Sequence, residues 1–340
     1  MTSIQRLRLR PDVYLGTHPD GELALVHAGR RGERFGALTS GQRAALRQLS
    51  NGWTTELELH ATIKLHDGHS NDGLLRRLAA GGWISTRIEL PDRPLVTVRP
   101  LGPNPDPPAR PAVPRLSRFA VLRRESDAFV LESPLARAAV TVHDGEVLTV
   151  LHGLAGSDPG SGARSLPEDV LDELVRILAW HRFVHDAEED VRPDFGSDQW
   201  TPHELLFHSR SRGGHHDEPA GPTMWAAGRF DPLPGRREPF GGTAIALPHP
   251  AITNDPPLSE VLESRRSIRW HDDEHPLSIE QLGEFLYRCA RVQRIDVDGG
   301  HEVSLRPSPA GGALQSLEIY PLVSRSRGVR PGLYHYDPFG

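Results

Sequence analysis

The order of helix and strand signals along the 340 residues predicts an α+β protein with more than one domain. Three observations support this: helical apolar spacing follows capping-box sequences, short β-branched runs follow the helices, and proline-rich stretches separate these groups. At about 100–200 residues per domain, the length fits two or three domains. The 31 prolines and 33 glycines indicate many loops. No apolar run approaches the roughly 20 residues that span a bilayer.

Residues 1–95 carry the signals of one small module. Residues 39–42 have capping-box spacing before apolar residues at helical spacing, and residues 71–73 precede a second amphipathic helix that carries Leu74, Leu75 and Leu78. Paired glycines at 81–82 end that helix, and residues 83–88 then have the composition of a strand. Helices followed by a short strand predict a winged-helix-like module for residues 1–95.

The pattern repeats after a proline-rich stretch, residues 96–114, which is expected to be an extended linker. Residues 119–131 contain two strand-like runs, and a helix is expected around residues 147–151, with a further amphipathic helix after it. Residues 115–190 are therefore predicted to form a second winged-helix-like module in tandem with the first. Residues 191–255 are expected to be a connector.

The composition limits the possible function classes. The net charge is −6 and no basic stripe is visible, so nucleic acid is not an expected partner. His181 and His185 are four residues apart but lack a third placed ligand, so no metal site is expected. The N-terminus lacks the apolar core of a signal peptide. A helix is expected to begin after Ser278, where Ser278 and Gln281 have capping-box spacing, and the single cysteine on it, Cys289, is expected to be a buried structural thiol. A cytoplasmic protein without a membrane partner is predicted.

The strongest functional signal is the run Ser264-Arg265-Arg266-Ser267-Ile268-Arg269-Trp270, which follows a helix expected over residues 258–263. Its guanidiniums and hydroxyls are suited to bind a phosphate. A second segment, residues 306–314, contains paired glycines that would let the backbone approach a flat ligand. Together the segments indicate a flavin site. Its expected cofactor-binding residues are Arg265, Arg266, Ser267, Arg269, Pro307, Ser308, Pro309, Ala310, Gly311 and Gly312.

Further motifs stand in a fixed order around these two segments. Trp200 and residues 203–214 precede them, and residues 317–320 and 331–338 follow them. In this order the motifs resemble the SagB/ThcOx-type FMN-dependent azoline (thiazoline/oxazoline) dehydrogenases, which are nitroreductase-like flavoproteins. The resemblance covers most of residues 195–340 and implies FMN as the cofactor.

The resemblance also implies that residues 256–340 are the N-terminal part of a nitroreductase-like FMN domain. Domains of that family are longer, so this one is expected to be incomplete, and the 340-residue chain alone is expected to bind FMN poorly. The family's proposed catalytic Lys-Tyr pair lies later in the domain, and the only lysine here is Lys64, so no catalytic residue is assigned. Residues 315–316 are Gln-Ser where the family more often has His-Pro.

The function that the resemblance implies is FMN-dependent oxidation of thiazoline or oxazoline rings to thiazoles or oxazoles in a ribosomally synthesised precursor peptide. The implied partners are that peptide, a cyclodehydratase or synthetase complex, and a second copy of the chain in a homodimer. The winged-helix-like modules could accept a leader peptide as an added strand or serve only as scaffold. Two other functions remain open: a nitroreductase-like NAD(P)H-dependent oxidoreductase on small acceptors, and a non-catalytic peptide-binding or scaffold subunit.

Overall fold

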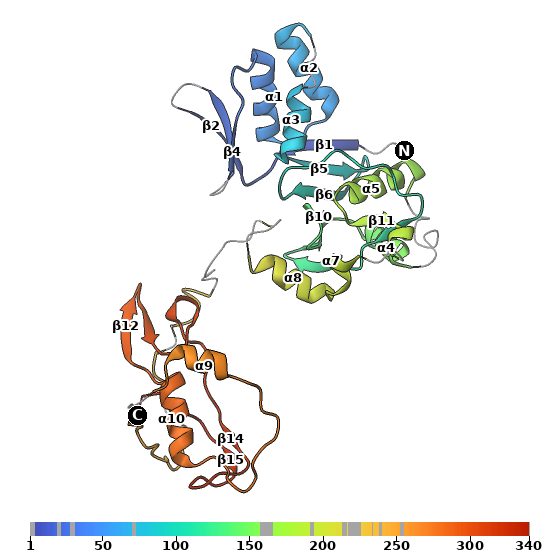
Figure 1. Cartoon of the computed structure of the whole chain (residues 1–340). Helices are drawn as coiled ribbons and strands as arrows, with labels where there is room; N and C mark the ends of the chain where they lie inside the picture. Colours follow the sequence, from blue (N-terminus) through green and yellow to red (C-terminus); the bar gives the residue numbers. More distant parts are fainter. Residues whose placement is uncertain are drawn as a thin grey trace. The chain divides into compact units, whose positions relative to one another are not determined.

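The chain divides into two compact units, Met1–Thr223 and Met224–Gly340 (Figure 1). The computed structural model describes residues 4–18, 22–27, 31–69, 73–156, 166–190, 194–212, 216, 226–232, 234–237, 240–251 and 255–339. Both units combine helices with antiparallel strands, in agreement with the predicted α+β class. Among the described residues, no helix has the length and apolar character needed to cross a membrane.

Unit 1 begins with a strand and a separate three-stranded antiparallel sheet, followed by three helices. The strands are β1 (Ile4–Leu9), β2 (Val13–Thr17), β3 (Leu23–His27) and β4 (Arg31–Arg34). The helices are α1 (Ser40–Asn51), α2 (Glu56–Asp67) and α3 (Gly73–Gly81). The capping box predicted at residues 39–42 is confirmed, because the side chains of Thr39 and Gln42 bond to each other's backbone N–H groups.

The helices of this first part share an apolar core, and a hydrogen bond links two of them. Leu46, Leu49 and Leu78 are fully buried in a common core with residues of β1 and β3. The Asp67 carboxylate, at the end of α2, accepts a hydrogen bond from the backbone N–H of Gly41 at 2.9 Å. Bonds from Thr39, then from Gly41, lower the pKa of Asp67. The start of α1 is therefore attached to the end of α2.

A single six-stranded antiparallel sheet runs through both predicted modules of unit 1, in the order β1-β5-β6-β10-β9-β8. Its other strands are β5 (Ile84–Glu89), β6 (Pro94–Pro100), β10 (Ala138–Val142), β9 (Ala128–Glu132) and β8 (Val121–Glu125). The expected linker therefore begins inside the sheet, because residues 96–100 belong to β6. Both prolines of β6 are terminal, which leaves the N–H groups between them free for pairing.

Two helices cover one face of this sheet, α4 (Gly145–Ala155) and α5 (Glu168–Trp180). Val140, Leu174 and Phe183 are among the buried residues of the core between the sheet and these helices. The helix predicted around residues 147–151 is confirmed as part of α4. Short elements complete the unit: β7 (Pro114–Leu116), β11 (Val184–Asp186), α6 (Ala187–Asp190), α7 (Phe195–Asp198) and α8 (Pro202–Arg210).

Unit 2 contains α9 (Leu258–Ser264), α10 (Ile279–Ala290), β12 (Arg294–Asp298), β13 (His301–Leu305), the 3-10 turn η1 (Gly311–Ala313), β14 (Leu322–Val323) and β15 (Gly332–Leu333). β12 pairs with β13, and β14 with β15. The prediction of a buried Cys289 is wrong, because its side chain is exposed. α10 buries Gly283, Leu286 and Ala290, at three- and four-residue spacing, and Cys289 lies outside that stripe.

Candidate functional site

The predicted phosphate-binding run leaves the C-terminal end of α9. The backbone N–H of Arg265 donates to the carbonyl of Val261 at 3.0 Å and ends the helix. Residues 265–270 then form an exposed coil, in which Trp270 is 90% exposed. Among the described residues, the guanidiniums of Arg265, Arg266 and Arg269 form no hydrogen bond or ion pair. All three are therefore available to an anionic ligand.

The predicted glycine segment forms an open turn around η1. Gly312 has a left-handed φ of 60°, and a Cβ on Gly311 would meet no atom within 4 Å. The Gln315 side chain donates to the carbonyl of Ser308 at 3.1 Å and closes the turn. Residues 307–312 are exposed. The backbone of this turn is therefore solvent-accessible.

The residues present fit FMN in chemical character: unpaired guanidiniums for a phosphate and an open glycine turn for a ring system. Among described residues 255–339, however, no hydrogen bond, ion pair or ring contact links the arginine run to the glycine turn. The ten predicted residues therefore lie in two exposed segments of one unit that make no such direct contact with each other in the described part of the chain. FMN binding remains a prediction.

An aromatic and histidine cluster in the same unit was not predicted from the sequence. The His335 ring lies 5.0 Å from that of Phe240 and 5.2 Å from that of Tyr320, and its Nε2 contacts the carboxylate of Glu318. Backbone bonds from Tyr334 and Tyr336 extend the β14–β15 pairing and place His335 opposite this region. The histidine side chain is 14% exposed. The available signal was the pair of motifs at residues 317–320 and 331–338, which the structure joins as one ladder.

A second candidate site is a groove of about 800 Å³ in unit 1. Its charged lining residues are Arg110, Arg118, Arg137, Arg182, Asp106, Asp186, Glu189, Asp190, Asp194 and Asp198. Phe119, Trp180 and several prolines supply apolar surface between these charges. A groove with hydrogen-bonding groups of both charges and apolar patches suits an extended polypeptide better than a small ion.

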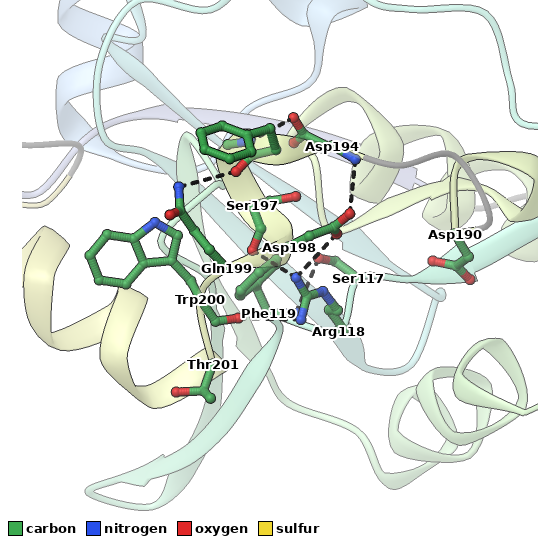
Figure 2. Close-up of polar contacts among 12 residues, drawn as sticks. Ser117, Arg118, Phe119, Asp190, Asp194, Ser197, Asp198, Gln199, Trp200 and Thr201 are labelled. Carbon is green, nitrogen blue, oxygen red and sulfur yellow. Dashed lines mark hydrogen bonds and ion pairs between the residues drawn. The ribbon is translucent and has the colours of Figure 1, made fainter.

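Arg118, in the turn between β7 and β8, connects the two sides of this groove. Figure 2 shows its guanidinium directed toward α7. It donates to the carbonyl of Ser197 at 2.8 Å and to that of Trp200 at 3.3 Å, and it lies 3.6 Å from the carboxylate of Asp198. The same group lies 4.2 Å from the centre of the Phe119 ring. One side chain therefore links the β7–β8 turn to α7 and to the residue two positions after it.

The carboxylate of Asp194 caps α7 on the same side of the groove. It accepts a bond from the N–H of Gly196 at 3.1 Å, and the Asp194 N–H donates to Asp198 at 2.9 Å (Figure 2). Bonds from the Ser197 side chain and then from Gly196 lower the pKa of Asp194. This carboxylate is therefore ionised at neutral pH and contributes negative charge to the groove.

His181 lies in the sequence between two residues that line the groove, Trp180 and Arg182, but is not itself a lining residue. Its side chain is buried, its ring stacks 5.2 Å from that of Trp180, and its Nδ1 has no hydrogen-bond partner among the described residues. Burial lowers its pKa to about 4. His185, four residues on, pairs with Asp190 at 2.7 Å. No group of three or more described His, Cys, Asp or Glu side chains could hold a metal ion.

The groove residues were missed by sequence reasoning because their contacts are long-range. Arg118 and Ser197 are 79 positions apart, and no periodic pattern relates them. The only earlier signal was the motif around Trp200 and residues 203–214. The ring of Trp200 packs 4.9 Å from that of His208 within this motif.

Comparison with family models of known proteins gave a match that covers part of the groove lining. The family model of the cyanobactin oxidase ThcOx matches residues 114–217. A search of curated proteins found no match. The matched stretch holds Arg118, Trp180 and α7, whereas the arginine run and the glycine turn lie outside it. The match supports a ThcOx-type oxidase family, and therefore an oxidoreductase in general, for a chain that the sequence motifs had linked to the same group.

Proposed function

We propose that this protein oxidises thiazoline or oxazoline rings to thiazoles or oxazoles in a ribosomally synthesised precursor peptide, with FMN as the cofactor. The observation that carries the proposal is the match to the cyanobactin oxidase over residues 114–217. The exposed arginine run and the open glycine turn of unit 2 support the choice of cofactor. They agree with a phosphate-bearing flat ligand and were identified independently of the match.

In this proposal each segment of unit 2 has a distinct task. Arg265, Arg266 and Arg269, with the Ser267 hydroxyl, would hold the phosphate and neighbouring polar groups. The backbone of residues 308–312 would border the ring system. A bound flavin supplies a hydride acceptor. The residues described here bind and orient, and no catalytic base is assigned to any of them.

The groove of unit 1 is the proposed contact for the peptide substrate. Its volume of about 800 Å³ lies in the range of ligand-binding clefts, and an extended segment can use both its carboxylates and its guanidiniums. The polypeptide backbone would find donors and acceptors along the Arg118 side. A cyclodehydratase or synthetase complex remains a proposed partner of the whole protein.

A homodimer is proposed because unit 2 exposes large apolar side chains. Leu258 is 73% exposed, Leu262 65%, Ile268 68% and Trp270 90%. Four such exposed apolar residues lie within one short segment, and a second copy of the chain would cover them. Sedimentation should show a dimer. A monomer at micromolar concentration would contradict this part of the proposal.

Titration of the protein with FMN, to concentrations high enough to saturate the weak binding expected of the 340-residue chain, tests the cofactor site through flavin fluorescence. Loss of charge-assisted phosphate contacts in Arg265→Ala should weaken FMN binding about ten- to a hundredfold. Arg330→Ala is the matched control, since Arg330 is also exposed and belongs to the same unit. Equal weakening by both substitutions, or by neither, would contradict the assignment of the arginine run.

Mass spectrometry of a peptide that contains azoline rings tests the reaction itself. Loss of two hydrogen atoms per ring is the expected result. Consumption of NAD(P)H with a small acceptor, without ring oxidation, would favour a nitroreductase-like activity instead. Peptide binding with neither flavin binding nor turnover would favour a non-catalytic subunit.

A further inference from the structure

The face of the six-stranded sheet opposite α4 and α5 carries an unusual number of arginines. Residues paired across antiparallel strands point to the same face. One row of paired residues runs through all six strands: Arg6, Arg87, Thr97, Thr141, Val130 and Arg123. The row two residues along includes Arg8, paired with Ser85, and Arg99, paired with Ala139.

Neighbouring groups extend this surface beyond the strands. The guanidinium of Arg87 stacks on the Trp53 ring, 4.1 Å from its centre. At the other end, Arg210 of α8 contacts the carboxylate of Glu132 and helps to line a hollow of about 400 Å³ with Arg99 and Arg123. The arginine face, as we call it, consists of Arg6, Arg8, Arg87, Arg99, Arg123 and Arg210.

The arginine face has more positive than negative charge, although the whole chain is acidic. Its six arginines are accompanied by four glutamates: Glu89, which pairs with Arg6, Glu58, whose charge also acts on Arg6, and Glu125 and Glu132, which pair with Arg123. Among the described residues, the Arg8 side chain forms no hydrogen bond or ion pair. Arg87 contacts Thr97 and Trp53 but no carboxylate.

The arginines at the β1–β5 end affect one another electrostatically. Partial burial lowers the pKa of Arg87. The charge of Glu89 opposes this effect, whereas the positive charges of Arg8 and Arg6 add to it. Partly desolvated positive charges that lie close together repel one another. This repulsion raises the free energy of the folded protein when no anionic partner is bound. An anionic partner would relieve this repulsion.

We infer that the arginine face binds an extended acidic peptide segment with carboxylates at alternate positions. Arg6 and Arg8 are two residues apart on one strand, roughly 7 Å, and alternate side chains of an extended peptide have the same spacing. The glutamates between the arginines would repel a continuous phosphate backbone, whereas separate carboxylates can lie between them. Peptide is therefore favoured over nucleic acid.

The inference does not depend on the proposed oxidation, because binding is measured without flavin or an azoline ring. The probe is a fluorescein-labelled Glu-Ser repeat of about ten residues, and the control probe is the matching Gln-Ser repeat. Fluorescence anisotropy with the full chain should show binding of the Glu-Ser probe alone. Its affinity should fall as salt increases.

A charge-matched pair of double variants tests the location. Arg8→Gln with Arg87→Gln should weaken Glu-Ser binding about tenfold or more, because two charge-assisted contacts are lost. Arg124→Gln with Arg47→Gln removes the same charge elsewhere and should leave affinity unchanged. Arg124 follows Arg123 on β8, so its side chain points to the opposite face.

A second measurement uses the unchanged protein and avoids any folding defect in the variants. The Glu-Ser probe should slow amide hydrogen exchange in β1 and β5, beyond the effect of the Gln-Ser probe. Protection elsewhere in the chain, equal weakening by both double variants, or tighter binding of a single-stranded DNA of equal charge would each overturn the inference.

Discussion

The buried imidazole of His181 should make unit 1 sensitive to mild acid. Burial lowers its pKa to about 4, compared with 6.5 for an ordinary histidine. Between these two values the unfolded chain binds a proton at this position and the folded chain does not. The free energy of unfolding therefore decreases as the pH falls through this range, and stability is fully retained only above about 6.5.

The size of the effect follows from the two pKa values. Between pH 7 and pH 5, His181 alone should remove about 2 kcal/mol from the free energy of unfolding. His181→Leu replaces the imidazole with an apolar side chain in a buried position where Nδ1 has no partner among the described residues. The variant should lose much less stability than the parent protein over the same interval.

Urea unfolding followed by tryptophan fluorescence at the two pH values measures this difference. The stacked Trp180 reports on the same region of the fold. His66→Gln is the control, because His66 is exposed and should leave the pH dependence of the parent unchanged. If His181→Leu and the parent lost equal stability between pH 7 and pH 5, the reasoning from burial would be refuted.

Two further substitutions test the construction of unit 1. Arg118→Ala removes the bonds to the carbonyls of Ser197 and Trp200. Since this guanidinium is half exposed, a loss of about 1 kcal/mol is expected, seen as roughly fivefold faster amide exchange in α7. Gly82→Ala should destabilise the protein by about 2 kcal/mol or more, measured by urea unfolding. Gly82 has a left-handed φ of 68°, and a Cβ there would lie 1.9 Å from the carbonyl oxygen of Gly102.

Each substitution has a matched control in the same unit. Arg124→Ala removes an exposed arginine whose bond, to the carbonyl of Ser126, is local, so exchange in α7 should not change. Gly145→Ala adds a Cβ that meets no atom within 4 Å at the start of α4, so stability should be unchanged or slightly higher. Equal effects of variant and control would contradict the assigned contacts.

The helices that could be predicted from the sequence are those whose signals are local. The capping boxes at Thr39 and Ser278 connect residues only three positions apart, and both form in the structure. The capping-box spacing of Ser278 and Gln281 identified the helix α10 correctly. It did not establish the exposure of Cys289, because that depends on which stripe of the helix meets the rest of unit 2.

The arrangement of strands could not be predicted because it depends on pairing between distant residues. β6 was interpreted as linker on account of its prolines, although Val98 pairs with Val140 in the middle of the sheet. The arginine face follows from that pairing, since arginines on four strands reach one surface only after the register is set. The groove at Arg118 depends in the same way on a contact across 79 positions.

The sequence by itself determined the α+β class and the helices that begin at the capping boxes of Thr39 and Ser278, because these signals depend on residues within a few positions of one another. Only the tertiary structure decided that one sheet joins both predicted modules, and that its open face collects positive charge. Strand pairing forms over long separations in the chain, and the side chains that meet there carry no local pattern that relates them.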